Sequence, residues 1–233
     1  MENIFSIAID GPAGAGKSTI ARAVADRLGA MYLDTGAMYR AVGLYFMRKG
    51  LDEDAKAVAE GVGAVQVAVK PENGKQRMYL NGEDVTEAIR TPEASLAASH
   101  VAAVPEVRAQ MVALQREIAR GYSIVMDGRD IGTKVLPDAT LKLFVTASPE
   151  VRAQRRYDEL KQKGTDTVSL NQVLREIKER DFNDTHRAAS PLEQAADAKL
   201  LDTSDMTPSQ VLDAVERLFQ EAIGGGADGQ QVL

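Results

Sequence analysis

Short hydrophobic runs alternate with amphipathic segments along most of this chain. Residues 4–9 form the first run, and their β-branched and aromatic side chains predict a buried strand. Further runs of strand length lie at 31–33, 123–126, 141–145 and 199–201. Helical patterns fall between them, at about 36–49, 92–120, 149–163, 169–186 and 207–222. This alternation predicts an α/β fold in which helices flank a parallel sheet.

Two segments depart from this alternation. Residues 65–69 and 77–80 form short runs separated by the turn residues 71–74, and the second run leads into Asn81-Gly82. Asn-Gly next to such runs is a strong hairpin signal, so we expect a small antiparallel β insertion at about 62–88. The glycine-rich end, 223–233, has no hydrophobic periodicity and is predicted to be a disordered tail.

Composition narrows the classes of protein that fit. With 233 residues, the chain can form one sizeable core with room for an insertion. Its net charge of -6 argues against general attraction to nucleic acid. The absence of cysteine excludes disulfides, thiolate catalysis and cysteine zinc sites. His100 and His186 are too few for a histidine-rich metal centre, and we expect surface or capping roles for them.

Targeting signals are missing from the pattern as well. The start of the chain lacks the basic and long hydrophobic regions of a signal peptide, and no stretch approaches the ~18 apolar residues of a membrane helix. We therefore expect a cytoplasmic protein that binds neither membranes nor nucleic acid.

The strongest chemical signal is a Gly-x-x-x-x-Gly-Lys-Ser motif between the first predicted strand and a predicted helix. Backbone amides of such a loop converge on nucleotide phosphates, at a helix N-terminus that favours negative charge. Lys17 would reach the β- and γ-phosphate oxygens, and the Ser18 hydroxyl would bind Mg²⁺, the cofactor of ATP. The predicted ATP-binding residues are Gly11, Pro12, Ala13, Gly14, Ala15, Gly16, Lys17, Ser18 and Thr19.

Polar residues also follow two later strands, where ligands bind in parallel sheets. Thr35 and Arg40 come after the strand at 31–33 and indicate either a second anion site or a helix-capping turn. Arg129 and Asp130 come after the strand at 123–126. An arginine there can hold a phosphate and a carboxylate can accept from the exocyclic amine of cytosine, although Arg129 could instead form a structural salt bridge.

Two arginine-containing sets share helix faces. Arg152, Arg155 and Arg156 have i, i+3, i+4 spacing, and arginines on a mobile segment can stabilise a phosphoryl group during transfer. The alternative is a solvated face on which Glu159 pairs with Arg155 or Arg156. The second set, which in isolation would be a surface ion-pair ladder, comprises Arg180, Asp184 and Arg187.

Taken together, these residues resemble the bacterial cytidylate kinases, a family of P-loop nucleoside monophosphate kinases, from residue 1 to about 222. The resemblance rests on residues 11–19, 33–40, 98–108, 127–133 and 180–187. It implies one P-loop NTPase domain, 1–222, with a five-stranded parallel core. It also implies a nucleoside-monophosphate-binding region at about 34–110 and a short helical lid at about 152–165.

The resemblance further implies which side chains contact CMP. Ser99, Arg108 and Asp130 would contact the cytosine, and Arg180 and Asp184 the sugar. The acceptor phosphate would be held by Thr35, Arg40, Arg129 and Arg187. Serine is common in the family where this chain has Thr35, and the substitution keeps the hydroxyl.

The function implied is ATP-dependent phosphorylation of CMP and dCMP in pyrimidine nucleotide metabolism, by a monomer. The catalytic residues would be Lys17, Arg129, Arg152, Arg156 and Arg187. Two alternatives remain open. A P-loop kinase of another small acceptor would need fewer acceptor-side arginines. A nucleotide switch or nucleic-acid-coupled ATPase should show an Asn-Lys-x-Asp motif or a basic face. The sequence has no such motif, and its net negative charge argues against a basic face.

Overall fold

The computed structural model describes residues 4–72, 75–162 and 168–224. They form two compact units. The first contains the chain up to Tyr32, Gly121–His186 and the chain from Pro191 onward. The second contains Leu33–Arg120 and Arg187–Ser190.

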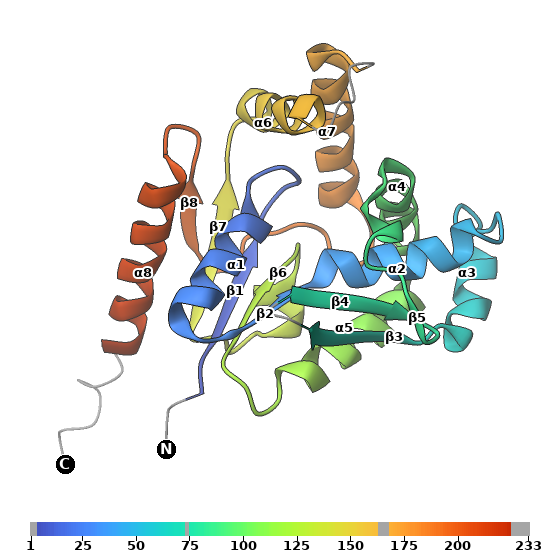
Figure 1. Ribbon diagram of the computed structural model, residues 1–233, viewed down its shortest axis with the longest axis horizontal. Helices are drawn as coiled ribbons and strands as arrows, with labels where there is room; N and C mark the ends of the chain where they lie inside the picture. The colour runs from blue at the N-terminus through green and yellow to red at the C-terminus, as the bar shows by residue number, and fades with distance from the viewer. Residues whose placement is uncertain (1–3, 73–74, 163–167, 225–233) are drawn as a thin grey trace. The chain divides into compact units, whose positions relative to one another are not determined.

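A five-stranded parallel sheet in the order β2-β6-β1-β7-β8 forms the core of the first unit (Figure 1). Its strands are β1 (Ser6–Asp10), β2 (Met31–Asp34), β6 (Ile124–Asp127), β7 (Leu141–Thr146) and β8 (Lys199–Asp202). The predicted parallel sheet is thereby confirmed. Because β1 lies between β6 and β7, the carboxyl ends of these strands bring Asp10, Asp127 and Thr146 to one edge of the sheet.

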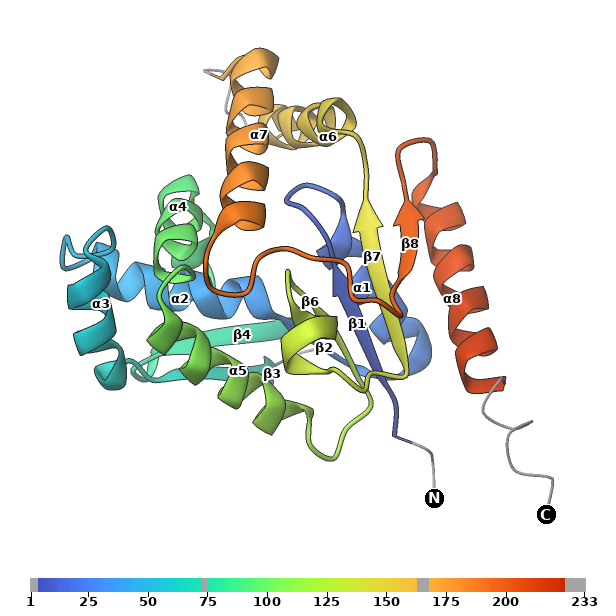
Figure 2. The same ribbon diagram turned by 180° about the vertical axis from the view of Figure 1, so that it is seen from behind.

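Two helices, α1 (Lys17–Leu28) and α8 (Pro208–Gly224), pack on one face of this sheet (Figure 2). Ile7 and Ile9 of β1 share a hydrophobic core with Val24 of α1 and Phe219 of α8. The helix predicted to follow the Gly-x-x-x-x-Gly-Lys-Ser motif is thereby confirmed. Since α8 continues to Gly224, the first two residues of the predicted tail are helical, and 225–233 lie outside the described residues.

The first unit also contains α6 (Pro149–Gln162) and α7 (Leu170–His186), which pack against each other. Ala153, Val173 and Ile177 form a small separate core between them. A π-helical turn, η3 (Ile131–Val135), follows β6. The sequence pattern did not predict η3, because five residues are too few to show a helical period.

The second unit combines four helices with a three-stranded antiparallel sheet in the order β3-β4-β5 among its described residues. The strands are β3 (Val67–Glu72), β4 (Lys75–Leu80) and β5 (Glu83–Asp84). The helical elements are α2 (Thr35–Met47), α3 (Ala55–Gly61), η1 (Val62–Ala64), η2 (Ala88–Arg90), α4 (Pro92–Val101) and α5 (Pro105–Ala119).

The predicted antiparallel insertion is confirmed. Asn81 and Gly82, at φ 48° and 85°, form a two-residue turn between β4 and β5. This is the left-handed geometry that Asn-Gly favours in hairpins. The other predicted turn was 71–74, but Pro71 and Glu72 are the last residues of β3, and Asn73 and Gly74 lie outside the described part of the chain.

The single helix predicted at 92–120 is wrong, because the chain forms α4 and α5 there. Val104 has extended backbone angles, φ -84° and ψ 121°, and Pro105 begins α5. Proline lacks an N–H group and disfavours helical angles in the residue before it. Proline at a helix start fits well, since the first N–H groups of a helix have no intrahelical partner.

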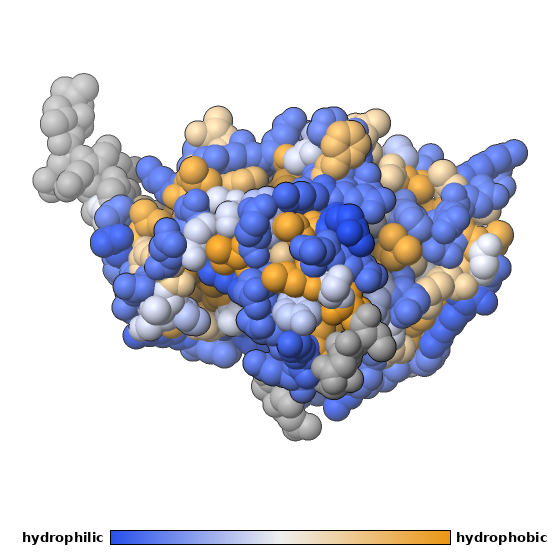
Figure 3. All heavy atoms as spheres, turned by 90° about the horizontal axis from the view of Figure 1, so that it is seen from above, coloured by the Kyte–Doolittle hydropathy of each residue, from blue (hydrophilic) through white to orange (hydrophobic). Residues whose placement is uncertain are grey.

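Hydrophilic side chains predominate on the face drawn in Figure 3, with hydrophobic ones scattered between them. Large exposed hydrophobic residues include Leu96 and Tyr122. In the part of the chain that the structure describes, no helix combines the length and the apolar character that crossing a membrane requires.

Candidate active site at the P-loop

The loop that follows β1 has the backbone geometry that its glycines predicted. Gly11 has φ 143°, and a Cβ atom there would lie 1.9 Å from the carbonyl oxygen of Val145. Gly14 and Gly16 also have positive φ angles, 75° and 82°, and Gly16 is the residue before α1. The loop therefore leads directly into a helix N-terminus, where free amides attract anions.

Lys17 is buried at the first position of α1, and its Nζ donates to the carbonyl oxygen of Pro12 at 2.6 Å. Burial, and secondly the charge of Arg129, lowers the pKa of Lys17 well below its ordinary value. A desolvated ammonium group is strongly stabilised by a nearby anion, because electrostatic attraction is stronger where water is excluded.

Ser18 and Tyr32 both bind the carboxylate at the end of β6. Ser18 Oγ donates to Asp127 Oδ2 at 2.7 Å, and the Tyr32 hydroxyl donates to Oδ1 at 2.9 Å. Asp127 was not among the predicted site residues. The signal was available, since Asp127 is the last residue of a hydrophobic strand.

The oxygen ligands of Ser18 and Asp127 fit Mg²⁺. This ion is usually held by one or two carboxylates together with substrate phosphates, rather than by an all-protein cage. In P-loop proteins it is bound by the loop hydroxyl and a strand-end aspartate. No cluster of three or more histidine or acidic side chains suited to a metal occurs in the described ranges.

Asp10 is a second buried carboxylate, and it was not among the predicted site residues either. It ends β1 and accepts hydrogen bonds from the backbone N–H groups of Ile131 at 2.8 Å and Gly132 at 2.7 Å. Burial raises the pKa of Asp10 to about 6. The charge of Asp130 acts in the same direction, whereas the two amides and Lys17 oppose it.

Asp10 should make the free energy of unfolding depend on pH between about 4 and 6. Its pKa is higher in the folded chain than the ordinary 3.8, so the folded chain binds this proton more tightly. Stability should therefore fall as the pH rises through about 6, by up to about 3 kcal/mol. Asp10→Asn should remove this component. Denaturant unfolding of both proteins at pH 4 to 7 measures it, and parallel pH curves would contradict the prediction.

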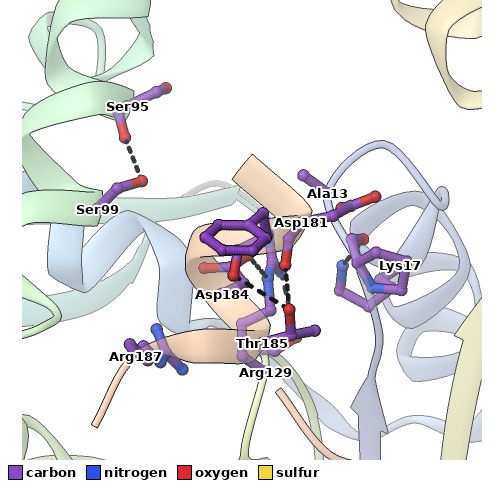
Figure 4. Close-up of polar contacts among 12 residues, drawn as sticks. Ala13, Lys17, Ser95, Ser99, Arg129, Asp181, Asp184, Thr185 and Arg187 are labelled. Atoms are coloured by element: carbon purple, nitrogen blue, oxygen red, sulfur yellow. Dashed lines mark hydrogen bonds and ion pairs between the residues drawn. The ribbon is translucent and has the colours of Figure 1, made fainter. Parts of the chain in front are cut away.

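Arg129 and Asp184 form an ion pair within the first unit (Figure 4). Arg129 Nε donates to Asp184 Oδ2 at 2.7 Å, and Nη1 donates to the carbonyl oxygen of Gly128 at 3.2 Å. Both side chains are largely buried. The structural salt bridge considered for Arg129 therefore exists. Asp130, next in sequence, is also buried, and Arg180 lies close enough to lower the pKa of Lys17.

The three arginines of α6 have different surroundings. Arg152 is buried and makes a two-pronged pair with Asp181 at 3.0 and 2.6 Å. It also donates to the carbonyl oxygens of Ala147, at 2.8 Å, and Ala13 of the P-loop, at 2.9 Å. The solvated helix face considered as an alternative therefore does not fit Arg152, because its guanidinium is buried against the backbone of the P-loop.

Arg155 and Arg156 have weaker links to the rest of the unit. Arg155 donates to the carbonyl oxygen of Thr203 at 2.7 Å and to its hydroxyl at 3.1 Å. Arg156 forms an exposed pair with Glu159 at 2.8 Å, which is one of the pairs expected for a solvated helix face.

The second unit holds the other predicted CMP contacts. Asp34 caps α2 by accepting from the Ala37 N–H at 2.8 Å, and it also accepts from Arg40 Nη2 at 3.0 Å. Thr35 is buried at the first position of the same helix. A hydroxyl and an arginine are thus gathered at a helix N-terminus, and the capping turn considered as an alternative is present too.

The remaining residues predicted to contact CMP lie on α4, α5 and the short segment 187–190. Ser99 Oγ donates to the carbonyl oxygen of Ser95 at 3.3 Å (Figure 4). Arg108 is buried, donates to the Ala102 carbonyl oxygen at 3.2 Å and lies over the ring of Tyr39. Arg187 Nε donates to the carbonyl oxygen of Ser190 at 2.7 Å.

Comparison with known proteins agrees with this geometry. A sequence model of the family described as cytidylate kinase matches residues 7–221. The chain is 49% identical to a cytidylate kinase of Caldicellulosiruptor bescii, a match that covers 94% of this chain and 97% of the relative. It is 52% identical to a cytidylate kinase of Pelotomaculum thermopropionicum, over 91% and 94% of the two chains.

Among solved structures, shikimate kinase from Bacteroides thetaiotaomicron is similar in fold. The TM-score is 0.50 at 14% identity, and the match covers 95% of this chain and 99% of the other. At this identity the likeness concerns the fold alone.

Proposed function

The chain belongs to the cytidylate kinase family, and on that premise we propose that it transfers the γ-phosphoryl group of ATP to CMP or dCMP, giving ADP and CDP or dCDP. The observation that carries this proposal is the P-loop, where Lys17 is desolvated and Ser18 is paired with Asp127. The family supplies the nature of the acceptor.

The proposed transfer is a single in-line displacement. An oxygen of the CMP phosphate forms a bond to the γ-phosphorus, and the bond from that phosphorus to the bridging oxygen breaks, so that ADP leaves with the electron pair. An ionised phosphate oxygen is already nucleophilic, so no covalent intermediate is needed. The protein's task is then to position the phosphates, offset their repulsion and exclude water.

We assign roles to the residues of the first unit on this basis. The P-loop amides and Lys17 would hold the β- and γ-phosphates, and Arg152 would keep the loop in place through the carbonyl group of Ala13. Ser18 and Asp127 would hold Mg²⁺, which neutralises phosphate charge when bound. Arg156 stays a predicted catalytic residue, because its exposed pair with Glu159 leaves the side chain able to move.

The proposed acceptor contacts are named for each of the two units by itself. In the second, which supports the predicted nucleoside-monophosphate region at about 34–110, the proposed contacts are Thr35, Arg40, Ser99, Arg108 and Arg187. In the first they are Arg129, Asp130, Arg180 and Asp184. The lid at about 152–165 remains part of the proposal, and 163–165 lie outside the described residues. A monomeric state and a cytoplasmic location also remain predictions.

A coupled assay of ADP release across the common nucleoside monophosphates tests this function. CMP and dCMP should be the best acceptors. A better rate with another monophosphate, or with a hydroxylated metabolite, would favour a different P-loop kinase. Hydrolysis of ATP that is stimulated by nucleic acid rather than by CMP would favour a nucleic-acid-coupled ATPase.

Asp130→Asn should weaken the preference for CMP more than it weakens ATP binding. An amide offers the cytosine amine only a neutral acceptor and can present its own N–H donor instead. The loss of one such hydrogen bond corresponds to roughly tenfold in kcat/KM. The measurement is the ratio of kcat/KM for CMP to that for UMP in both proteins. An unchanged ratio would count against base recognition by Asp130.

A further inference from the structure

Asp10 joins the strand before the P-loop to the backbone that follows Arg129 and Asp130. Both of its carboxylate oxygens are used, because Oδ1 accepts from the Ile131 N–H at 2.8 Å and Oδ2 from the Gly132 N–H at 2.7 Å. Two adjacent amides bound to one carboxylate fix both the distance and the orientation of that backbone.

Gly132 packs directly against the Asp10 carboxylate. A Cβ atom there would lie 3.4 Å from Asp10 Oδ2 and 3.2 Å from Cδ of Lys142. The same backbone is held from its other side, because the Asp130 carbonyl oxygen accepts from the Lys134 N–H at 2.8 Å within the turn η3. The backbone on either side of the Asp130 side chain is thus fixed.

A carboxylate in this position is costly for the fold. Asp10 is only 4% exposed, in a strand whose other buried residues are hydrophobic. Burying an ionised group disfavours folding unless hydrogen bonds or charges compensate. A hydrophobic residue would complete the strand at a lower cost, so packing alone does not account for Asp10.

We propose that Asp10 is a positioning residue for the acceptor, which holds Asp130 and Arg129 in the orientation that CMP requires. The inference rests on the proposed function. Asp10 immediately precedes Gly11, so one side chain links the loop for the donor nucleotide to the residues for the acceptor. Its effect is expected on CMP recognition rather than on ATP affinity, because the carboxylate binds the backbone of Ile131 and Gly132 and not the P-loop amides.

Asp10→Asn is the direct test, because asparagine keeps the shape but provides one acceptor oxygen for two N–H groups. We expect kcat/KM for CMP to fall roughly tenfold or more, as for a lost hydrogen bond to a charged group. The ratio of kcat/KM for CMP to that for UMP should fall as well. Calorimetric affinity for a non-hydrolysable ATP analogue should change by less than about threefold.

Asp54→Asn is the matched control. Asp54 also accepts from two backbone N–H groups, those of Lys56 at 3.1 Å and Ala57 at 3.0 Å, but it is an exposed cap of α3. This variant should retain wild-type kinetics. If Asp10→Asn behaves like Asp54→Asn, or weakens the ATP analogue as much as CMP, the inference is overturned.

Gly132→Ala provides a second route if Asp10→Asn fails to fold. It places a methyl group between the Asp10 carboxylate, at 3.4 Å, and Cδ of Lys142, at 3.2 Å, so a smaller loss of the same kind is expected, confined to CMP. Equal losses for CMP and the ATP analogue, or none, would overturn the inference.

Asp130→Asn in the same assays separates base recognition by Asp130 from the positioning role of Asp10. An unchanged ratio of kcat/KM for CMP to that for UMP in this variant contradicts the proposed base recognition and not the role of Asp10.

Discussion

Replacing Lys17 with alanine is expected to lower kcat by more than about 10²-fold, the scale of removing one preorganised electrostatic group. The fold should persist. Burial of the charge lowers the pKa of Lys17, which means that the folded state disfavours the ammonium form, so relief of this cost should offset the lost hydrogen bond to the Pro12 carbonyl oxygen. Steady-state kinetics and thermal unfolding of the purified variant provide the measurement.

Lys56→Ala serves as the control for Lys17→Ala, because Lys56 is a highly exposed lysine of α3. It should match the wild type in both measurements. Activity of Lys17→Ala within threefold of the wild type would remove this lysine from the mechanism.

Arg152→Ala should destabilise the protein by about 3 kcal/mol, since removing one partner of a buried ion pair leaves the other uncompensated. The substitution would leave Asp181 without its two-pronged partner and the carbonyl oxygens of Ala13 and Ala147 without a donor. Because Ala13 belongs to the P-loop, ATP affinity should fall too. Denaturant unfolding and calorimetry measure the two effects.

Arg156→Ala is the matched comparison on the same helix. Its pair with Glu159 is exposed, so the free energy of unfolding should change by less than about 1 kcal/mol. A reduced kcat without a change in stability would support a catalytic role for Arg156, and an unchanged kcat would make it part of a solvated face. Equal stabilities of the two variants would contradict the importance of the buried contacts of Arg152.

The sequence predicted the elements whose signals are local. Residues 4–9 and the glycines at 11, 14 and 16 define strand, loop and helix without reference to the rest of the chain. Asn81-Gly82 likewise determines its own turn. The division of 92–120 into two helices was not predicted, because the helical pattern continues on both sides of Pro105. The effect of this proline on Val104 interrupts the helix over only a few residues.

The parts of the site that were missed depend on distant contacts. Asp10 accepts hydrogen bonds from Ile131 and Gly132, which lie more than a hundred residues later in the sequence. Asp127 accepts from Ser18 and Tyr32 across similar sequence separations. The spacing within α6 placed its arginines on one face. It could not reveal that Arg152 is buried against Asp181, which belongs to another helix.

The pairing of arginines with carboxylates has a consequence for how the protein distinguishes anions. Arg40 already has Asp34 as a partner, and Arg129 has Asp184. An anion that reaches either guanidinium must compete with a carboxylate held in place by the fold. A chloride ion carries too little charge and makes too few hydrogen bonds to do so, whereas a phosphate dianion offers several acceptor oxygens. In the proposed acceptor contacts these carboxylates would therefore compete with an incoming anion and favour a phosphate dianion over a monovalent anion such as chloride.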